Sequence, residues 1–285
     1  MLPHTLLTAD AQAELALFTD ALERFCDAEI EPHYRAWEKA GIVPRELFLK
    51  MGDNGYLCAD VPEEYGGSGL KDFRYEQIMC EELANINEAG FMLPLHSALC
   101  GPYITEYGNA EQKARLLPGI ISGEIILAVA MTEPSAGSDL AGMRTTAVDK
   151  GDHYELNGSK VFITGGGRAD TYVVFAMTDK TKGNKGISAF IVDKDDPGFS
   201  IGKIEHKMGI RGSQTAELIF EDVHLPADRL LGKENGGFKI AMMTLDGGRI
   251  GVGAQALGIA EGAYNAALQY AKERTQFGKP IGKFQ

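Results

Sequence analysis

The hydrophobic period of this chain changes twice along its length, and that change constrains the fold more than any other feature of the sequence. From about residue 11 to 123 apolar residues recur at helical spacing, from about 125 to 225 they alternate with polar residues, and after Pro226 the helical spacing returns. No helix alternates with the strands of the middle region, so a parallel, doubly wound sheet does not fit. We therefore expect an α+β multidomain fold with a helical N-terminal domain (1–124), a central antiparallel β domain (125–232) and the start of an incomplete C-terminal helical bundle (233–285).

The first region carries signals for the ends of its helices. Thr8 is suited to cap a helix that Pro32 would end, and Pro44 suits the first turn of a helix that runs to Met51. Pro94 should bend the helix that contains it, because proline removes a backbone hydrogen bond from a helix interior. The other helical stretches, including the one with Pro94, are expected at residues 72–85, 89–107 and 110–122.

The middle region consists of alternating runs separated by polar, glycine-containing breaks. Asn157-Gly158 lies between two such runs, and this dipeptide is the strongest short signal for a β-hairpin turn. Three further runs are rich in β-branched and aromatic residues, at 171–177, 186–192 and 216–223. The region is therefore expected to form antiparallel strands.

The third region predicts one very long helix, from about residue 236 to 277, with six glycines in its interior. Each of these glycines costs the helix up to about 1 kcal/mol relative to alanine, so a close neighbour must pack against the small-residue face. Residues 251–256 also match the spacing of a dinucleotide-binding fingerprint. No strand precedes them and the helical pattern continues through them, so we favour close helix packing over that function.

Composition excludes several classes of function. The formal net charge is −12, whereas a nucleic-acid-binding protein usually carries a basic face. No apolar run reaches the roughly 18 residues of a membrane helix, so stable membrane insertion is not expected. The four cysteines form no CxxC pair and the six histidines no metal-binding motif, which indicates buried, reduced thiols and no metal site. The N-terminus does not resemble a secretory signal, so we expect a cytoplasmic protein in a bacterium or a mature protein of the mitochondrial matrix.

Two segments of the middle region end in a similar way. Residues 128–139 and 160–167 each begin as a strand and pass into a glycine-containing turn, and the last strand residue is a threonine, Thr132 in the first and Thr164 in the second. A polar turn after a strand is the simpler interpretation of either segment alone. Together, backbone N–H groups and threonine hydroxyls at strand ends can hydrogen-bond the heteroatom edge of a flat heterocycle.

Eight stretches of the sequence occur in the order seen in the acyl-CoA dehydrogenase family, namely YGGSGL, AMTEPSAGSD, LNGSKVFIT, GISAFIV, FEDVHLP, LGKENGGFK, LDGGR and ERTQFGKPIGKFQ. The chain is similar to this family over essentially its whole length. Residues before about Asp179 resemble the long-chain branch, and those after Gly186 resemble the short-chain, butyryl-CoA branch. The resemblance implies a helical domain, a β domain and a C-terminal helical bundle in a homotetramer, which agrees with the changes in hydrophobic period.

The resemblance implies FAD as the cofactor and places two segments beside it. Thr132 would face the isoalloxazine ring, Ser138 would lie near the pyrophosphate and the substrate, and Thr164 would bond near flavin N5. Residues after the long helix would reach FAD held by a neighbouring subunit, where the guanidinium of Arg274 suits a pyrophosphate. The cofactor-binding residues implied are Val129, Ala130, Met131, Thr132, Glu133, Pro134, Ser135, Ala136, Gly137, Ser138, Phe162, Ile163, Thr164, Arg274, Gln276 and Phe277.

The resemblance also implies a substrate site and the position of the catalytic base. In the family the general-base glutamate lies either late in the C-terminal bundle or directly before the arginine of the LDGGR-like stretch, where this chain has Gly248. We therefore expect the base beyond Gln285 and no turnover by this chain alone. Asp246 is expected to point to a different face of the helix. The residues expected beside the acyl-CoA are Ser138, Asp246, Gly247, Gly248 and Arg249.

The reaction implied is FAD-dependent α,β-dehydrogenation of a fatty acyl-CoA to the trans-2-enoyl-CoA, with electrons passed to an electron-transfer flavoprotein. A carboxylate whose pKa is raised by burial would remove the α-proton while the β-hydrogen leaves as hydride. Two alternatives remain open, an acyl-CoA oxidase that would reduce oxygen directly and a non-catalytic fragment or scaffold of the same fold. The partners expected are acyl-CoA, the electron-transfer flavoprotein and copies of the chain itself.

Overall fold

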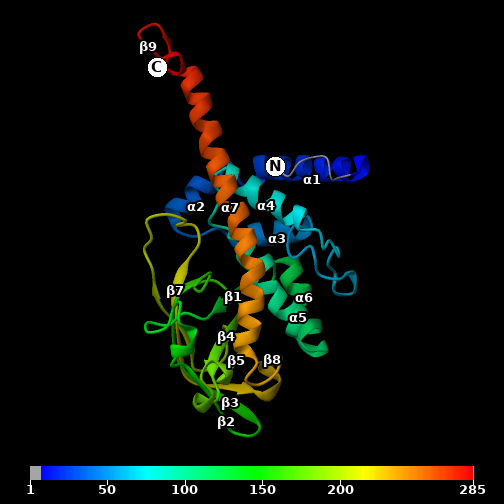
Figure 1. Cartoon of the computed structure of the whole chain (residues 1–285), viewed down its shortest axis with the longest axis vertical. Coiled ribbons are helices and arrows are strands. Elements are labelled where there is room, and N and C mark those ends of the chain that lie inside the picture. The colour runs from blue at the N-terminus through cyan, green and yellow to red at the C-terminus, as the bar shows by residue number, and fades with distance from the viewer. Residues whose placement is uncertain (1–7, 285) are drawn as a thin grey trace.

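The computed structural model describes residues 8–284 and shows helices at one end, a β-sheet at the other and one long helix running along both (Figure 1). This arrangement confirms the α+β architecture expected from the hydrophobic period. The helical part contains α1 (Ala9–Glu29), α2 (Tyr34–Ala40), α3 (Arg45–Asp53), the 3-10 turn η2 (Glu63–Tyr65), α4 (Phe73–Asn85), η3 (Pro94–Cys100), α5 (Gly101–Tyr107) and α6 (Ala110–Ser122).

Capping residues explain where several of these helices begin and end. The Oγ1 atom of Thr8 accepts a hydrogen bond from the N–H of Ala11 at 3.2 Å, so the predicted cap of α1 is confirmed. A capping box formed with Asn109 begins α6. The same helix ends at Gly123, whose φ is +78°, and a Cβ there would lie 2.3 Å from the carbonyl oxygen of Phe48. Only glycine therefore allows α6 to end so close to α3.

Pro94 begins a helix rather than bending one, so that prediction was wrong. The η3 segment is a π-helix that starts at Pro94 and continues directly as α5 from Gly101. Proline suits the first position of a helix because its missing N–H would have no helical partner there. Single π-helical turns are frequent at functional sites, and η3 lines both cavities described below.

The middle region forms one sheet with the strand order β6-β7-β3-β2-β4-β5-β8, and β1 pairs with β4 outside this path. Most neighbouring strands are antiparallel, as predicted, but β1 runs parallel to β4 and β2 meets β4 in a parallel pair. The strands are β1 (Leu127–Ala130), β2 (Thr146–Asp149), β3 (His153–Thr164), β4 (Thr171–Met177), β5 (Ile187–Asp193), β6 (Phe199–Ile204), β7 (Thr215–Pro226) and β8 (Leu230–Leu231), with the 3-10 turns η4 (Leu140–Gly142), η5 (Lys180–Gly186) and η6 (Ala227–Arg229) between them.

Asn157-Gly158 does not form the predicted hairpin turn. Strand β3 runs straight through the dipeptide, and the turn that joins β2 to β3 lies at residues 150–152. The pairing of β3 with β7 shifts register at this point, because β7 has one extra residue opposite the dipeptide and bulges there. Gly158 has φ +142°, and a Cβ there would lie 2.6 Å from Oγ1 of Thr145. Pairing on both sides of β3 has outweighed the local turn preference.

Strand β4 lies at the centre of the core because both of its faces are covered. Tyr172 and Val174 belong to a cluster that includes Leu22 of α1, whereas Phe175 on the other face belongs to a cluster that includes Tyr103 of α5. All residues of β4 are buried. The four cysteines are free and buried, which confirms that expectation. Residues of the helical part and of the sheet therefore pack together in both clusters.

The long helix α7 (Gly237–Glu273) is confirmed, and α4 with η3 supplies the close neighbour that its glycines require. A Cβ at Gly262 would lie 2.4 Å from the carbonyl oxygen of Asn85 in α4. The fingerprint-like residues 251–256 lie in the middle of α7, which rules out a strand-to-helix phosphate turn. After α7 come β9 (Thr275–Gln276), β10 (Lys279–Pro280) and the 3-10 turn η7 (Ile281–Lys283).

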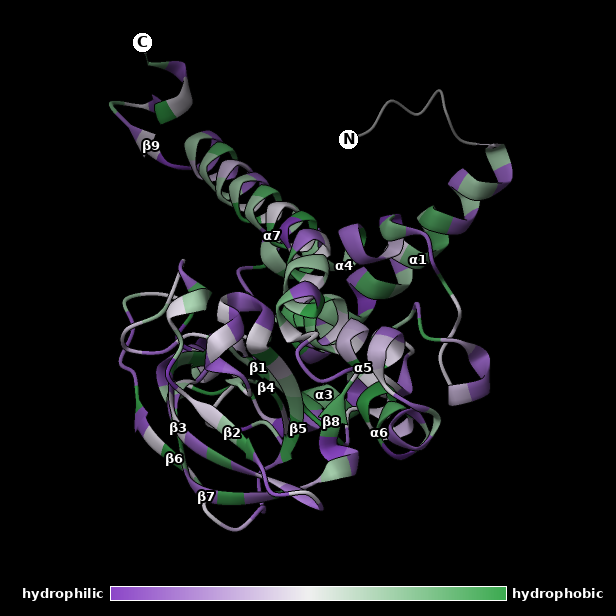
Figure 2. Cartoon of the chain, turned by 60° about the horizontal axis from the view of Figure 1, so that its bottom comes forward, coloured by the Kyte–Doolittle hydropathy of each residue, from purple (hydrophilic) through white to green (hydrophobic). Residues whose placement is uncertain are grey.

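The second half of α7 projects beyond the rest of the molecule (Figures 1 and 2). Apolar and polar residues mix along it, and Leu257, Tyr264 and Leu268 expose much of their side chains. Within residues 8–284, no helix combines the length and the apolar character needed to cross a membrane.

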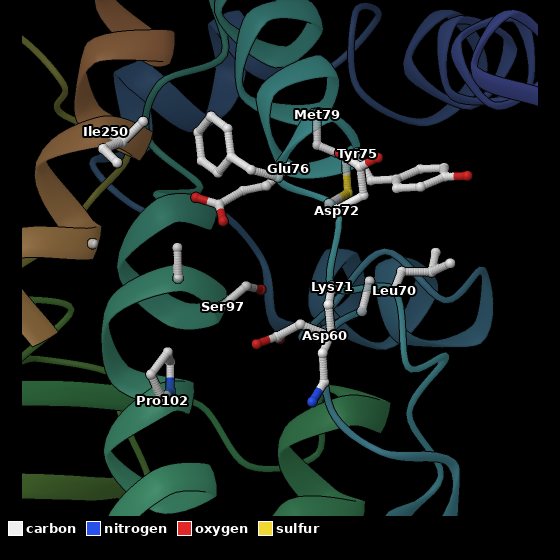
Figure 3. Close-up of a pocket in the computed structure, with 14 residues that line it drawn as sticks. Asp60, Leu70, Lys71, Asp72, Tyr75, Glu76, Met79, Ser97, Pro102 and Ile250 are labelled. Carbon is white, nitrogen blue, oxygen red and sulfur yellow. The ribbon is translucent and has the colours of Figure 1, made fainter. Parts of the chain in front are cut away.

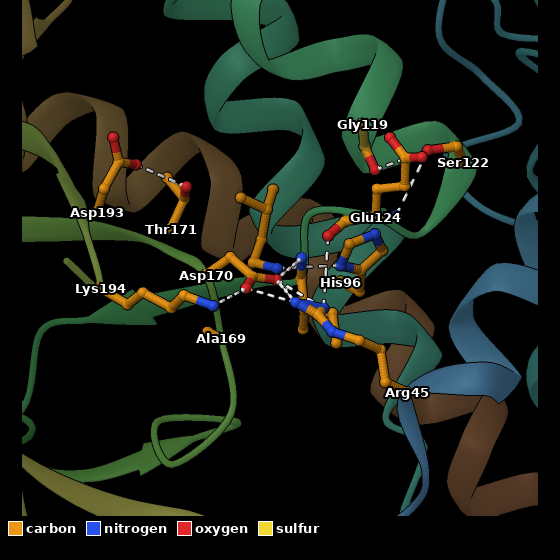
Figure 4. Close-up of polar contacts among 12 residues, drawn as sticks. Arg45, His96, Gly119, Ser122, Glu124, Ala169, Asp170, Thr171, Asp193 and Lys194 are labelled. Carbon is orange, nitrogen blue, oxygen red and sulfur yellow. Dashed lines mark hydrogen bonds and ion pairs between the residues drawn. The ribbon is translucent and has the colours of Figure 1, made fainter.

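A network of ion pairs joins the helical part to the sheet (Figure 4). Arg45 at the start of α3 and Lys194 after β5 both bind the carboxylate of Asp170, which also accepts a hydrogen bond from the N–H of Ile126 at 2.9 Å. Burial alone would raise the pKa of Asp170, but these hydrogen bonds and charges hold it below its ordinary value. The network fixes the starts of β1 and β4 against α3.

Candidate functional site

The two segments that contain Thr132 and Thr164, residues 128–139 and 160–167, lie side by side. The N–H of Val161 in β3 donates to the carbonyl oxygen of Thr132 at 2.9 Å, so the end of β3 is bonded to the loop that follows β1. Thr132 and Thr164 are both half-buried, which leaves part of each at the surface. The end of β3 and the loop after β1 therefore lie together, with both threonines partly at the surface.

Phe162, which belongs to the second segment, is held in a strained and exposed position. Strand β3 bulges between Lys160 and Ile163, and Phe162 within the bulge has φ +58° with its side chain 64% exposed. A residue with a Cβ in this left-handed region costs roughly 1–2 kcal/mol, and such strain concentrates at functional sites. The ring offers a flat apolar surface on which another flat ring can stack.

A buried ion pair lies behind the same two segments. The Nζ atom of Lys160 lies 2.8 Å from Oε1 of Glu133 and 3.1 Å from the carbonyl oxygen of Met131, and neither charged side chain is more than 3% exposed. Glu133 also accepts hydrogen bonds from the N–H groups of Arg144 at 2.6 Å and Thr145 at 3.0 Å.

The electrostatics of this pair reflect its burial. Burial lowers the pKa of Lys160 to about 8, and the charge of Glu133 opposes that change. For Glu133, burial would raise the pKa, but the charge and hydrogen bond of Lys160 and the donors at residues 144–145 hold it below its ordinary value. Glu133 is therefore an ionised carboxylate near neutral pH.

Lys160 is not among the site residues expected from the sequence, although the pattern of β3 contains a signal for its burial. Tyr154 and Leu156 point into the core, and Lys160 has the same parity along the strand. A charged side chain at an inward position needs a partner, and Glu133 is that partner. Because its carboxylate turns inward, Glu133 would meet a cofactor only through its backbone. The other buried residues nominated for the cofactor are Ala130, Met131, Ala136 and Ile163.

An apolar cavity of about 290 Å³ lies between η3 and the first half of α7. A Cβ at Gly248 would lie 3.0 Å from Cδ1 of Leu99, so these two residues close one side of it. Leu95 lies 3.9 Å from the position of a Cβ at Gly165, which directly follows Thr164. The cavity therefore adjoins the end of β3. Its wall is formed by Met92, Pro94, Leu95, Leu99, Leu245, Gly248, Arg249 and Val252.

The residues nominated for the substrate divide between different sides of α7. Gly248 and Arg249 line the apolar cavity, whereas Gly247 lines a second cavity. Asp246 is exposed, accepts a hydrogen bond from Nη1 of Arg249 at 2.8 Å, and does not line the apolar cavity. Ser138 is exposed in the loop after β1.

The second cavity, also about 290 Å³, lies between α4, η3 and α7 (Figure 3). Asp60, Lys71, Glu76 and Ser97 make its wall more polar than that of the first cavity. The Oε1 atom of Glu76 is buried and has no hydrogen-bond partner among the residues that the structure describes. Burial, reinforced by the charge of Asp60, raises the pKa of Glu76 to about 7.

A buried histidine fixes η3 against the start of β1. The Nε2 atom of His96 lies 3.1 Å from the carbonyl oxygen of Ile120, and Nδ1 lies 3.3 Å from the N–H of Leu127. Nδ1 therefore accepts and Nε2 donates, which requires a neutral ring. Burial lowers the pKa of His96 to about 4, so the ring stays neutral near pH 7. The helix that lines the apolar cavity is thereby joined to the strand that leads to Thr132.

Arg274, Gln276 and Phe277 lie at the far end of α7, away from the sheet (Figure 1). All three are exposed, and Phe277 is 93% exposed with φ +51°. Within one copy of residues 8–284 they are therefore not part of the site around Thr132 and Thr164. Arginine and aromatic residues displayed in this way are typical of contacts with another molecule.

Family models match this chain along nearly its whole length. The acyl-CoA dehydrogenase N-terminal domain matches residues 12–124, the middle domain matches residues 128–223, and the C-terminal domain matches residues 235–285.

Individual proteins match over similar spans. The short-chain-specific acyl-CoA dehydrogenase of Clostridium acetobutylicum is 50% identical over 273 residues, which are 95% of this chain and 72% of that protein. A subunit of the caffeyl-CoA reductase–Etf complex of Acetobacterium woodii is 47% identical over 250 residues, which are 87% of this chain and 65% of that protein. The structure of butyryl-CoA dehydrogenase from Megasphaera elsdenii superposes with a TM-score of 0.91 at 47% identity, covering 98% of this chain and 73% of that one. This chain is shorter than these relatives.

Proposed function

Because this chain belongs to the acyl-CoA dehydrogenase family and is an oxidoreductase, we propose that it takes part in FAD-dependent α,β-dehydrogenation of a short-chain fatty acyl-CoA to the trans-2-enoyl-CoA. One observation supports the flavin site most directly. Phe162 is an exposed aromatic residue held at φ +58° near the end of β3, where β3 is bonded to the loop that carries Thr132. Neither the exposure nor the strain stabilises the fold, so both need a function outside it.

The residues at this edge fit a flavin. Thr132 and Thr164 present hydroxyl and backbone groups that suit the heteroatom edge of the ring, and Phe162 presents a stacking surface. Ser138 is exposed in the adjoining loop, where its hydroxyl would bind a phosphate oxygen. When bound, FAD supplies the acceptor for the β-hydrogen of the thioester as hydride.

The apolar cavity is the proposed site for the acyl chain. It adjoins the end of β3, so an acyl chain seated in it would place its reactive carbons beside the flavin edge. Its volume of about 290 Å³ lies at the lower end of the range for ligand sites, which favours a short chain. Arg249 at the cavity wall would anchor the polar end of the substrate.

The catalytic base is not among the residues that line the apolar cavity. Its wall within residues 8–284 contains no carboxylate, and the family position before Arg249 is occupied here by Gly248. We therefore propose that the carboxylate that removes the α-proton comes from outside the described residues. A buried position would suit it, because desolvation raises the pKa of a carboxyl group towards working pH.

Further copies of the chain and an electron-transfer flavoprotein are the proposed partners. The exposed Arg274, Gln276 and Phe277 suit the contact between subunits that the family implies, as in a homotetramer. An Etf complex contains a relative of this chain, which supports Etf as the electron acceptor. The relatives named above come from bacteria, which favours a cytoplasmic location over the mitochondrial matrix.

Titration with FAD tests the proposal first. The expected result is quenching of flavin fluorescence and a resolved visible spectrum. In a protein that also includes the carboxylate proposed to lie outside the described residues, the visible band should disappear when butyryl-CoA is added under anaerobic conditions. No binding at about 100 μM FAD would contradict the proposed flavin site. Comparison of oxygen with electron-transfer flavoprotein as acceptor then separates a dehydrogenase from an oxidase.

A further inference from the structure

We propose that the buried Lys160–Glu133 pair is a positioning device that sets the separation of the two segments beside the flavin, residues 131–138 and 160–164. The inference rests on the proposed function, because it concerns how this chain would hold FAD. It adds a role for Lys160, which would not touch the cofactor, and for the inward-turned side chain of Glu133.

The contacts of the pair join three separate parts of the chain. Lys160 belongs to β3, two residues before Phe162, and its Nζ atom reaches the loop after β1 at the carbonyl oxygen of Met131, at 3.1 Å. Through Glu133 the same cation is linked to the N–H groups of Arg144 and Thr145, which lie just before β2.

The loop positions that the pair holds lack the repeated hydrogen bonds of a sheet. Residues 131–136 are outside β1, and among the described residues their backbone is held mainly by a turn between Glu133 and Ala136 and by the bond from Val161 to Thr132. A carboxylate that accepts three hydrogen bonds, one of them from an ammonium group, is a strong additional anchor. The pair therefore limits how far the loop after β1 can move relative to β3.

Stability alone is a poor explanation for this pair. Removing two charges from water costs several kcal/mol for each ion, and replacement of a buried pair by apolar residues is often neutral or stabilising. A buried pair of this kind is explained better by the geometry that it enforces, and here that geometry joins the loop after β1 to the strand that carries Phe162.

Three variants separate positioning from folding. Lys160→Met removes the cation and leaves Glu133 buried, which risks unfolding. The double variant Lys160→Met/Glu133→Gln leaves no unpaired charge in the interior, so it keeps the test usable if the single variant does not fold. Arg229→Met is the matched control, because it removes a cation from the half-buried carboxylate of Asp193, which keeps hydrogen bonds from Thr171 and Arg115. Arg229 lies in η6, outside both segments.

The full chain and each variant are titrated with FAD, and circular dichroism of the apoproteins reports folding. We expect the double variant to keep its secondary structure and to bind FAD at least about tenfold more weakly than the unmodified chain. The visible spectrum of its bound flavin should also be shifted. Arg229→Met should match the unmodified chain in FAD affinity and in the flavin spectrum. An equal affinity and an identical spectrum in the double variant would overturn the inference and leave the proposed function intact. Failure of the unmodified chain to bind FAD would contradict the proposed function itself, and the inference with it.

Discussion

Gly258 of α7 packs against the backbone of Glu81 in α4 so closely that a Cβ at Gly258 would lie 2.5 Å from the carbonyl oxygen of Glu81. No real Cβ contact is this short, so the two helices can approach to this distance only where α7 has no side chain. The relationship explains why a helix of 37 residues keeps several glycines in its interior despite their cost.

Alanine substitutions at two glycines of α7 test this explanation. Gly258→Ala forces α7 and α4 apart and should lower the free energy of unfolding by about 1–3 kcal/mol. Gly253→Ala is the matched control, because a Cβ there meets nothing within 4 Å. The gain in helix propensity should raise the free energy of unfolding of this variant by up to about 1 kcal/mol. Urea denaturation followed by circular dichroism measures both. Equal effects of the two substitutions would show that helix packing does not decide which glycines are required.

Phe162→Gly should separate stability from cofactor binding. Glycine adopts φ +58° without strain, and the side chain that the substitution removes is mostly exposed, so little packing is lost. The substitution should therefore raise the free energy of unfolding by about 0.5–1 kcal/mol. The same change removes the proposed stacking surface, so FAD should bind several-fold more weakly. Thermal denaturation of the apoprotein and FAD titration give the two values. A loss of stability with unchanged FAD affinity would mean that the ring serves the fold instead.

The stability of the protein should depend on pH through Glu76. Its folded-state pKa of about 7 lies above the ordinary value of 4.5, so its contribution to stability is fully present below about pH 4.5 and is lost as the pH rises through about 7. Glu76→Gln does not titrate, so it should be more stable than the unmodified chain by about 2–3 kcal/mol at pH 8 and no more stable near pH 4.5. Urea denaturation at both pH values measures the difference.

The opposite contribution of His96 serves as an internal check on this experiment. The pKa of His96 is lowered to about 4, so its stabilising effect is present above about pH 6.5 and is lost as the pH falls towards 4. This effect occurs equally in the unmodified chain and in Glu76→Gln, and it cancels in the comparison. A difference between the two proteins that does not change between pH 4.5 and 8 would contradict the unusual titration of Glu76.

A glutamate in place of Gly248 should supply a base at the apolar cavity. A Cβ at Gly248 would lie 3.0 Å from Leu99, so the substitution is combined with Leu99→Ala to make room. The apolar wall should raise the pKa of the new carboxyl group, as suits a general base. With FAD bound and butyryl-CoA added, the double variant Gly248→Glu/Leu99→Ala should reduce its flavin at least about tenfold faster than Leu99→Ala alone.

Gly248→Gln/Leu99→Ala is the control for that experiment, because glutamine has the same size and cannot remove a proton. Equal rates with glutamate and glutamine would show that no base has been added. Asp246→Asn should leave every rate unchanged, since Asp246 is exposed and does not line the apolar cavity.

Much of this protein could be predicted from its sequence, because the spacing of apolar residues is a local property. The helical period placed α4 and α6 within a residue of their observed bounds and identified α7 as a single helix with a close neighbour. The similar patterns around Thr132 and Thr164 indicated which segments to compare, and the structure places those segments side by side. The predicted strand end at Thr132 was wrong, because β1 ends at Ala130 and Thr132 lies in the loop that follows.

Tertiary structure alone decided the features that depend on contacts between distant residues. Asn157-Gly158 has a strong turn preference, yet pairing with β2 and β7 keeps β3 continuous through it. The alternation of β3 places Lys160 at an inward position, but the sequence does not pair it with Glu133, and only the folding of three segments around them removes both from water. Alternation of apolar and polar residues predicts which way a side chain points, but it does not predict what lies there to meet it. The cost of burying a charge is met only by a partner, and the partner's position is a property of the whole fold.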